Sequence, residues 1–241
     1  RFYFRLSPDV APDAQTVAAI NQASLQIATL SGERRQSEFM KILALVEVEK
    51  AVDFLARVDA LETTLGDAGN SGYGAWNFAR LSAMLAHEQA LPVPSDALLR
   101  LAALMPDMQT AEAVAASLRL SHRRRQRISA ILDHPGADLV HRPQHYLHYN
   151  GAPYVSDQAV MALADGKISP AEAGSVLALA NDWVAPRFPL RGSDMAAAGM
   201  PEGSAMGRLL AELEAWWVAQ DFPTKQVVEA EFHRRWPSDD D

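Results

Sequence analysis

The stretch LSGERRQSEFMKILAL, residues 30–45, shows most clearly which fold class the chain adopts. Ser31 interrupts an earlier helical pattern and is of the residue type that caps a helix N-terminus. Phe39, Ile42 and Leu43 follow at helical spacing, which predicts a helix over most of the stretch. The same succession of cap, apolar stripe and break recurs along the chain. We therefore predict an all-α fold, built as an elongated array of packed helices and helical hairpins.

The neighbouring segments extend this pattern in both directions. A helix predicted over residues 12–30 has one apolar face, formed by Val17, Ile20, Leu25, Ile27 and Leu30. A further helix is predicted over residues 48–61, and Ser95 is predicted to cap another. Residues 133–156 change character, because Pro and Gly interrupt a group of His and Tyr residues. No pair of strands joined by a hairpin turn is found.

Composition limits the possible functions. The chain has 241 residues, 49% of them apolar, which suffices for one large domain or two small ones. Its formal net charge of -8 argues against a generally basic protein that coats nucleic acid. The absence of cysteine excludes disulfides and thiolate chemistry, and it fits a reducing compartment. No apolar run has the length of a membrane span, and there is no signal-peptide pattern, so we expect a cytoplasmic protein.

A basic cluster is the clearest charge feature. Five arginines lie within nine residues that contain no acid: Arg119, Arg123, Arg124, Arg125 and Arg127. On a helix that starts after Ser121, Arg123 and Arg127 share a face, with Arg124 beside them. Guanidinium groups bind phosphate oxygens in bidentate fashion, so the cluster indicates a directed phosphate contact in an otherwise acidic protein. The alternative is a solvated helix face with no ligand.

Three histidines invite a metal hypothesis. His145 and His148 are three residues apart and His141 lies near, but Pro143 interrupts any continuous helix between them. Zinc sites need three or four converging ligands, and no acidic residue stands at the required spacing. We therefore predict no metal site, and expect these rings to pack between helices instead.

A glycine-rich segment follows near the C-terminal end. A short helix is predicted from Ser193 to Gly199, and Pro201 and Gly203 then shape a tight turn. Gly207, one turn into the next helix, leaves room for close approach of another backbone or a ligand. Free amide groups at such a turn form a natural phosphate site. The alternative is a tight helical hairpin that simply requires small residues.

At this point the residues resemble a known family, the class II CCA-adding enzymes and bacterial poly(A) polymerases. The C-terminal signature of that family is similar to Phe188-Pro-Leu-Arg-Gly-Ser-Asp194, Gly199-Met-Pro-Glu-Gly203, Met206-Gly-Arg-Leu-Leu210 and Glu214-Ala-Trp216. Its neck segment is similar to Leu30-Ser-Gly-Glu-Arg34 with Glu38 and Lys41, and its helical body to Leu98–Leu104 and Leu118–Ser121. The resemblance extends over nearly the whole chain. One departure is Ser204, where the family often has Pro.

The resemblance implies a parent enzyme that adds nucleotides from CTP and ATP, or from ATP alone, to RNA 3′ ends. The family's catalytic head holds two metal ions with an Asp-x-Asp pair next to a Gly-rich loop. This chain has no Gly-Gly pair, and its only Asp-x-Asp is Asp239 with Asp241. Arg1-Phe2 resembles the segment that follows the family's nucleotide-selecting motif. We therefore expect that this chain lacks the head and has no catalytic residues of its own. We also expect no cofactor in this chain, because Mg²⁺ would bind only in the head.

By the same resemblance we expect neck-like helices over residues 1–65, a helical body over 66–155 and a tail-like region over 156–241. The expected partner is RNA, specifically tRNA, and neither DNA nor a membrane; a homodimer is left open. One contact set comprises Arg123, Arg124, Arg125 and Arg127, and a second comprises Arg191, Gly203, Gly207 and Arg208. The alternative is a helical protein-interaction or dimerisation module with no RNA role. Two features suggest this alternative: the negative net charge, and three tryptophans that could line an interface, Trp216, Trp217 and Trp236.

Overall fold

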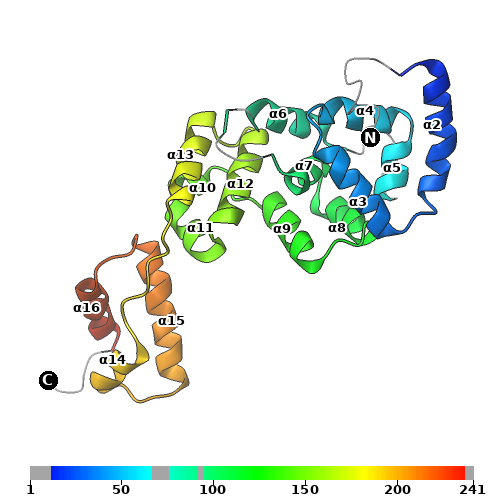
Figure 1. The fold of residues 1–241 in the computed structure, drawn as a ribbon. Helices are drawn as coiled ribbons and strands as arrows, with labels where there is room; N and C mark the ends of the chain where they lie inside the picture. Colours follow the sequence, from blue (N-terminus) through cyan, green and yellow to red (C-terminus); the bar gives the residue numbers. More distant parts are fainter. Residues whose placement is uncertain (1–11, 67–75, 89, 92–94, 237–241) are drawn as a thin grey trace.

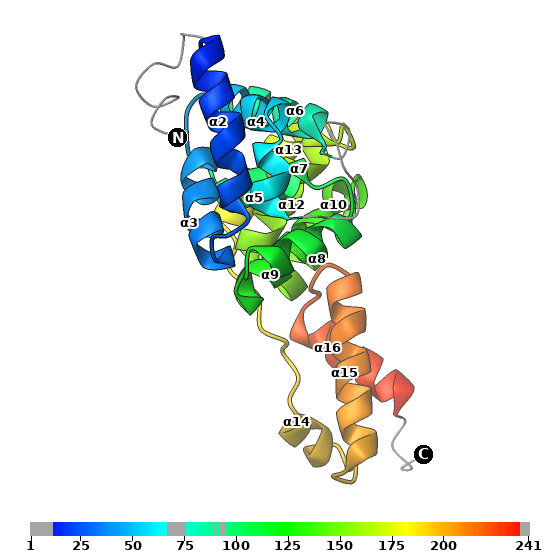
Figure 2. The same ribbon diagram turned by 90° about the vertical axis from the view of Figure 1, so that its right-hand side faces the viewer.

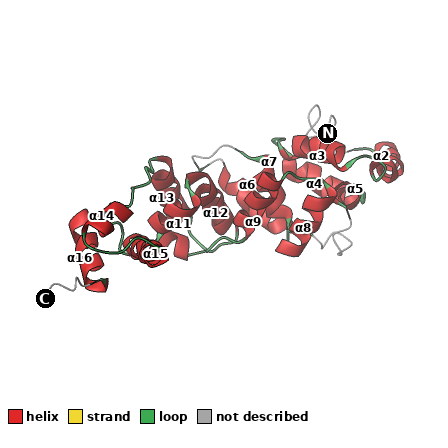
Figure 3. Ribbon diagram, turned by 90° about the horizontal axis from the view of Figure 1, so that it is seen from below, coloured by secondary structure: helices red, strands yellow, loops and turns green. Residues whose placement is uncertain are grey.

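The computed structural model describes residues 12–66, 76–88, 90–91 and 95–236. Within these ranges it contains fifteen helices and no strand, which confirms the all-α prediction (Figure 3). The first eight are α2 (Ala14–Ile27), α3 (Gly32–Leu43), α4 (Val48–Arg57), α5 (Ala60–Leu65), α6 (Phe78–Glu88), α7 (Ala97–Leu104), α8 (Met108–Ser117) and α9 (His122–Leu132). The others are α10 (Asp138–His141), α11 (Pro143–Asn150), α12 (Ala152–Ala164), α13 (Pro170–Asn181), α14 (Gly192–Ala197), α15 (Ser204–Ala219) and α16 (Lys225–Arg235). Arg1-Phe2 and the Asp239/Asp241 pair lie outside the described residues.

The helices form an elongated body with a smaller unit at one end. Helices α2 to α13 make the body, with α2 at one end and α11 and α13 at the other (Figure 1). Helices α14 to α16 project from the α11 end, and a second view shows them below the body (Figure 2). No helix in the described ranges is both long enough and apolar enough to cross a membrane.

Two main clusters of buried side chains correspond to these two parts. The larger runs through the body from Phe39 to Ala180, and the smaller runs through α14 to α16, from Leu190 to Phe232. The divisions expected at residues 65 and 155 remain predictions, although the larger cluster continues across both positions.

The stretch that opens α3 joins the N-terminal helices to the body. Ser31 caps α3, its Oγ accepting from the Arg34 N–H at 3.3 Å. The next residue, Gly32, is buried so tightly against α8 that an added Cβ would lie 2.4 Å from the Ser117 carbonyl oxygen. Arg35 Nη2 donates to that same carbonyl at 3.1 Å, and its Nη1 donates to the Thr64 carbonyl at 2.8 Å. A few consecutive residues thus fasten α3, α5 and α8 together.

A buried arginine makes a second connection between α3 and the body. Arg100 of α7 donates to the carbonyls of Leu43 and Leu45, at 2.6 and 2.9 Å, where α3 ends. Its guanidinium also pairs with Glu88, the Nε to Oε1 distance being 2.9 Å. The paired charges and the carbonyls satisfy a guanidinium that is almost completely buried.

The predicted apolar face of the first helix is partly wrong. Leu25 is 75% exposed and Leu30 is 39% exposed. At 100° per residue, Leu25 lies about 140° around the helix from Ile20, so both cannot face the same neighbour. Leu30 lies beyond the end of α2, at Ile27. The α2 helix therefore packs on one side only, against α5.

Three local predictions also need correction. The helix expected over residues 48–61 is broken into α4 and α5, because Asp59 adopts a left-handed conformation with φ of 52°. Asp96, not Ser95, caps α7, and its carboxylate accepts from the Leu98 and Leu99 amides at 2.8 and 2.9 Å. Residues 133–156 are more helical than expected, since they contain α10, α11 and the start of α12.

Candidate nucleic-acid interface

Four of the five arginines of the basic cluster lie in the first two turns of α9, and Arg119 precedes the helix. Ser121 caps this helix, its Oγ accepting from the Arg124 N–H at 3.4 Å. Ile128 and Ile131 are buried and hold the helix against the body, which leaves Arg123, Arg124 and Arg125 exposed. The amphipathic pattern of α9 thus places the cationic residues outward at one end of the helix.

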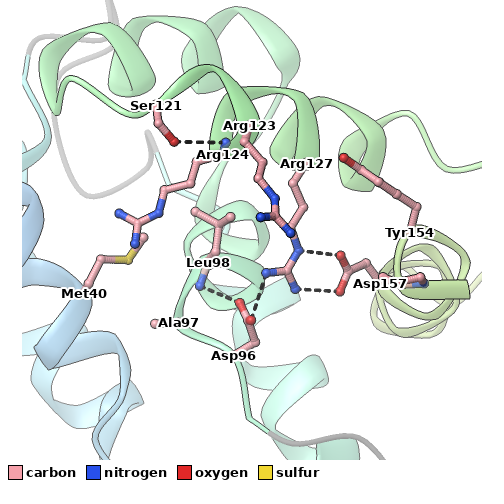
Figure 4. Close-up of a pocket in the computed structure, with 11 residues that line it drawn as sticks. Met40, Asp96, Ala97, Leu98, Ser121, Arg123, Arg124, Arg127, Tyr154 and Asp157 are labelled. Carbon is pink, nitrogen blue, oxygen red and sulfur yellow. Dashed lines mark hydrogen bonds and ion pairs between the residues drawn. The ribbon is translucent and has the colours of Figure 1, made fainter. Parts of the chain in front are cut away.

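Arg127 is held by two carboxylates. Its Nε and Nη2 donate to both oxygens of Asp157, at 2.6 and 2.8 Å, and its Nη1 donates to Asp96 Oδ2 at 2.9 Å (Figure 4). These bonds, chiefly those that Asp157 accepts, raise the pKa of Arg127. Burial raises the pKa of Asp157, an effect that Arg127 opposes. Arg127 therefore joins α9 to α7 and α12, and each of its three nitrogens already has an acceptor.

Arg123 and Arg124 differ from Arg127 because neither side chain has a hydrogen-bond or ion-pair partner among the described residues. Both line a pocket of about 620 Å³ between α9, α7, α3 and the start of α12. Met40 of α3 lies on the Arg124 side of this pocket, and Tyr154 of α12 lies on the opposite side (Figure 4). We call it the α9 pocket. Its guanidinium groups are available for a ligand, and its volume is in the usual range for small-ligand sites.

The other two arginines of the cluster point to different places. Arg125 Nε donates to the Leu120 carbonyl at 2.9 Å, and the residue lines a separate pocket of about 400 Å³ with Met108 and His122. Arg119, in a left-handed conformation with φ of 51°, pairs with Glu33 of α3 at 3.0 Å. The structure thus divides the cluster, and only Arg123 and Arg124 share the α9 pocket with Arg127.

The second predicted contact set lies at the smaller unit of helices α14 to α16, which we call the C-terminal unit. Arg191, Gly203, Gly207 and Arg208 are all exposed. The expected tight helical hairpin is present, since a Cβ on Gly192, where α14 begins, would lie 3.5 Å from the sulfur of Met206 in α15. No heavy atom lies within 4 Å of a Cβ placed on Gly207. Gly207 therefore brings no other segment of the described chain close; the space beside it is open.

The expected packing of histidines between helices is found for His148, whereas His145 packs against a ring of its own helix and His141 is exposed. His145 meets Tyr149 edge to face with a centroid distance of 5.0 Å, and His148 meets Trp217 of α15 in the same way at 5.9 Å. Trp217 is 3% exposed, and its Nε1 donates to the Pro223 carbonyl at 2.8 Å. The C-terminal unit is thus attached to α11 through aromatic packing. Trp217 therefore gives no support to the alternative of a protein interface, because it is buried in the core.

A metal ion has no fitting place in the described ranges. They contain no group of three or more His, Asp or Glu side chains that could hold one.

Sequence reasoning missed Tyr154 and Met40. They come from helices distant in sequence from the arginines, and only the packing of α3 and α12 around α9 brings them together. No motif in the sequence marks either residue.

The fold and the pocket define an all-helical protein with two arginines, Arg123 and Arg124, that line a pocket and have no polar partner among the described residues. Comparison with protein families identifies one segment of this protein: residues 9–65 match a family model described as the probable RNA and SrmB- binding site of polymerase A. The chain thus carries this domain of the poly(A) polymerase family, and the resemblance is confirmed for the segment that includes the LSGER motif. The signature over residues 188–216 lies outside the match and stays a prediction. A comparison with curated proteins finds no match.

Proposed function

We propose that this chain holds RNA for an enzyme that extends RNA 3′ ends, with tRNA as the expected substrate. One observation carries the proposal: Met40, from the segment that matches the RNA-binding domain, lines the same pocket as Arg123 and Arg124. Two unpaired guanidinium groups beside that domain fit the phosphate backbone of a nucleic acid.

The matched segment supplies few free charges of its own. Lys41, Lys50 and Arg57 are paired with acids three or four residues earlier in the sequence, and Arg35 is used in the connection to α8. Arg34 is the single lysine or arginine of residues 12–65 without a polar side-chain partner among the described residues. Additional cations are therefore needed for tight binding, and the arginines of α9 supply them.

Within the first contact set, Arg123 and Arg124 bind phosphate directly. Arg127 acts as a positioning residue, because each of its three nitrogens already donates to Asp96 or Asp157. Arg191, Arg208 and the amides near Gly203 form the second contact set, on the C-terminal unit. Together the two sets would fix the distance between a held part of the RNA and its 3′ end.

Nucleotide addition itself is assigned to the catalytic head of the parent enzyme. We expect this chain alone to incorporate no labelled ATP or CTP into tRNA, even with Mg²⁺ present. Incorporation at a rate that depends on this chain would contradict the assignment.

The binding proposal is tested by titrating labelled tRNA with the chain and measuring fluorescence anisotropy. Arg123→Ala with Arg124→Ala is expected to weaken binding by about tenfold or more, since hydrogen bonds to charged groups contribute about 1.5–3 kcal/mol each. The matched control is Arg142→Ala with Arg234→Ala, which removes the same charge from exposed arginines that do not line the pocket. Equal affinity for the two double variants would contradict the proposal.

A protein partner is the second candidate function, and one observation favours it. The family description includes binding to SrmB as well as to RNA, and Leu25 in the matched segment is 75% exposed. We propose that the outer face of α2 contributes to such a contact. Leu25→Asp should weaken capture of SrmB and leave tRNA affinity unchanged. Unchanged capture would exclude this face.

A further inference from the structure

The α9 pocket has more than phosphate-binding groups, because it is hollow and has an aromatic wall. Its volume is about 620 Å³, which is larger than a phosphate group requires. Tyr154 lies across the pocket from Arg124, with Arg123 between them, and its side chain rises toward α9 (Figure 4). The tyrosine is partly exposed and has no hydrogen-bond partner among the described residues. The pocket therefore offers two unpaired cations and one accessible ring.

We infer that the α9 pocket binds one nucleotide, with its 5′-phosphate on Arg123 and Arg124 and its base against the ring of Tyr154. The inference rests in part on the proposed RNA-binding function and adds that the RNA is single-stranded where it enters the pocket. A base can lie against a protein ring only when it has left its own stack. A free nucleoside monophosphate has the same chemistry, so the experiment separates these two sources.

The position of the two acids explains where the phosphate binds. Asp96 and Asp157 also line the pocket and would repel an anion, but both are bonded to Arg127. The three guanidinium groups exceed the two carboxylates by one positive charge. Because Arg127 faces the acids, the unbalanced positive charge lies at Arg123 and Arg124, on the open side.

The fixed position of Arg127 also favours one binding geometry for the ligand. Arg127 is bonded to two carboxylates from two other helices, so it loses little freedom when a ligand arrives. Tyr154 comes from the first turn of α12, the same helix that provides Asp157. The Arg127–Asp157 pair therefore fixes the spacing between the arginines of α9 and the tyrosine ring.

The test compares substitutions of Tyr154 in the full chain. The probes are a single-stranded ten-residue poly(A), an RNA duplex of the same length, AMP and inorganic phosphate. Tyr154→Leu should weaken binding of the single strand by on the order of tenfold, since loss of one base–aromatic stack has about this effect. Tyr154→Phe should bind like wild type. Tyr149→Leu is the matched control, because Tyr149 is 54% exposed and outside the pocket.

The outcomes separate the inference from the function on which it rests. AMP should shift amide resonances of residues around the pocket and compete with the single strand, and inorganic phosphate should bind more weakly than AMP. If Tyr154→Leu and wild type bind the single strand equally, the base is elsewhere and the inference fails, while RNA binding stands. If wild type binds AMP at the pocket and no RNA, the proposed function fails and the nucleotide is a free one. If AMP leaves the pocket resonances unchanged, the inference is wrong for both sources.

Discussion

Substitution of Gly32 by Ala tests how the segment that matches the RNA-binding family model is attached to the body. A Cβ at this position would lie 2.4 Å from the Ser117 carbonyl oxygen and 3.0 Å from the Cγ of Arg119. A normal C···O contact is about 3.3 Å or longer, so the two helices must separate by about 0.9 Å. The carbonyl cannot move freely, because it accepts a hydrogen bond of 3.1 Å from Arg35.

The expected cost follows from two opposing effects. Overpacking a tight contact destabilises by about 1–3 kcal/mol, while replacing Gly by Ala in a helix otherwise stabilises by up to about 1 kcal/mol. We expect a net loss of about 1–2 kcal/mol. For a chain of this size, 2 kcal/mol corresponds to a decrease in Tm of roughly 4–8 °C.

Thermal and urea unfolding followed by far-UV circular dichroism measure this loss. Gly174→Ala in α13 is the matched control, since no heavy atom lies within 4 Å of a Cβ placed there. The control should be as stable as wild type or more stable by about 0.5–1 kcal/mol. The reasoning would be refuted if Gly32→Ala gained stability as the control does.

Three other substitutions test different parts of the structure. Arg100→Met should reduce the free energy of unfolding by about 3–5 kcal/mol in urea titrations, because it leaves Glu88 buried without its partner; a loss below about 1 kcal/mol would contradict this. Burial alone would raise the pKa of the Asp165 carboxyl. Hydrogen bonds, the largest contribution coming from His134, outweigh burial, so the pKa of Asp165 lies below its usual value. Asp165 should therefore stabilise the fold above about pH 4 and lose that effect as the pH falls, and Asp165→Asn should flatten the pH dependence of stability below about pH 4. Gly207→Ala should preserve or slightly raise Tm and weaken tRNA binding; unchanged affinity would mean that RNA does not approach this glycine.

Features of the fold that depend only on residues close together in the sequence could be predicted from it. Ser31 is predicted to be an N-cap, and its hydroxyl accepts from the amide three residues later. A cap depends on one side chain and one turn of backbone, so its signal is local. The break at Asp59 could not be foreseen, because a left-handed aspartate interrupts an apolar pattern that continues across it.

The candidate site was predictable only in part for a related reason. The arginine cluster is visible in the sequence, but its division depends on acids that lie elsewhere in the chain. Arg127 and Arg123 share a helix face, yet Arg127 is paired with Asp157, thirty residues away, while Arg123 has no polar side-chain partner in the part of the chain that the structure describes. Tyr154 contributes through the packing of α12 against α9, which no spacing rule describes.

The most direct test of the central claim is the salt dependence of tRNA binding by the whole chain. Contacts to phosphate release counterions, so the logarithm of the association constant should fall steeply and linearly with the logarithm of the salt concentration. Replacing Arg123 and Arg124 by Ala should reduce the slope by about 1.4–1.8, at about 0.7–0.9 per phosphate contact. A slope near zero for wild type, or the same slope for wild type and the double variant, would contradict the account.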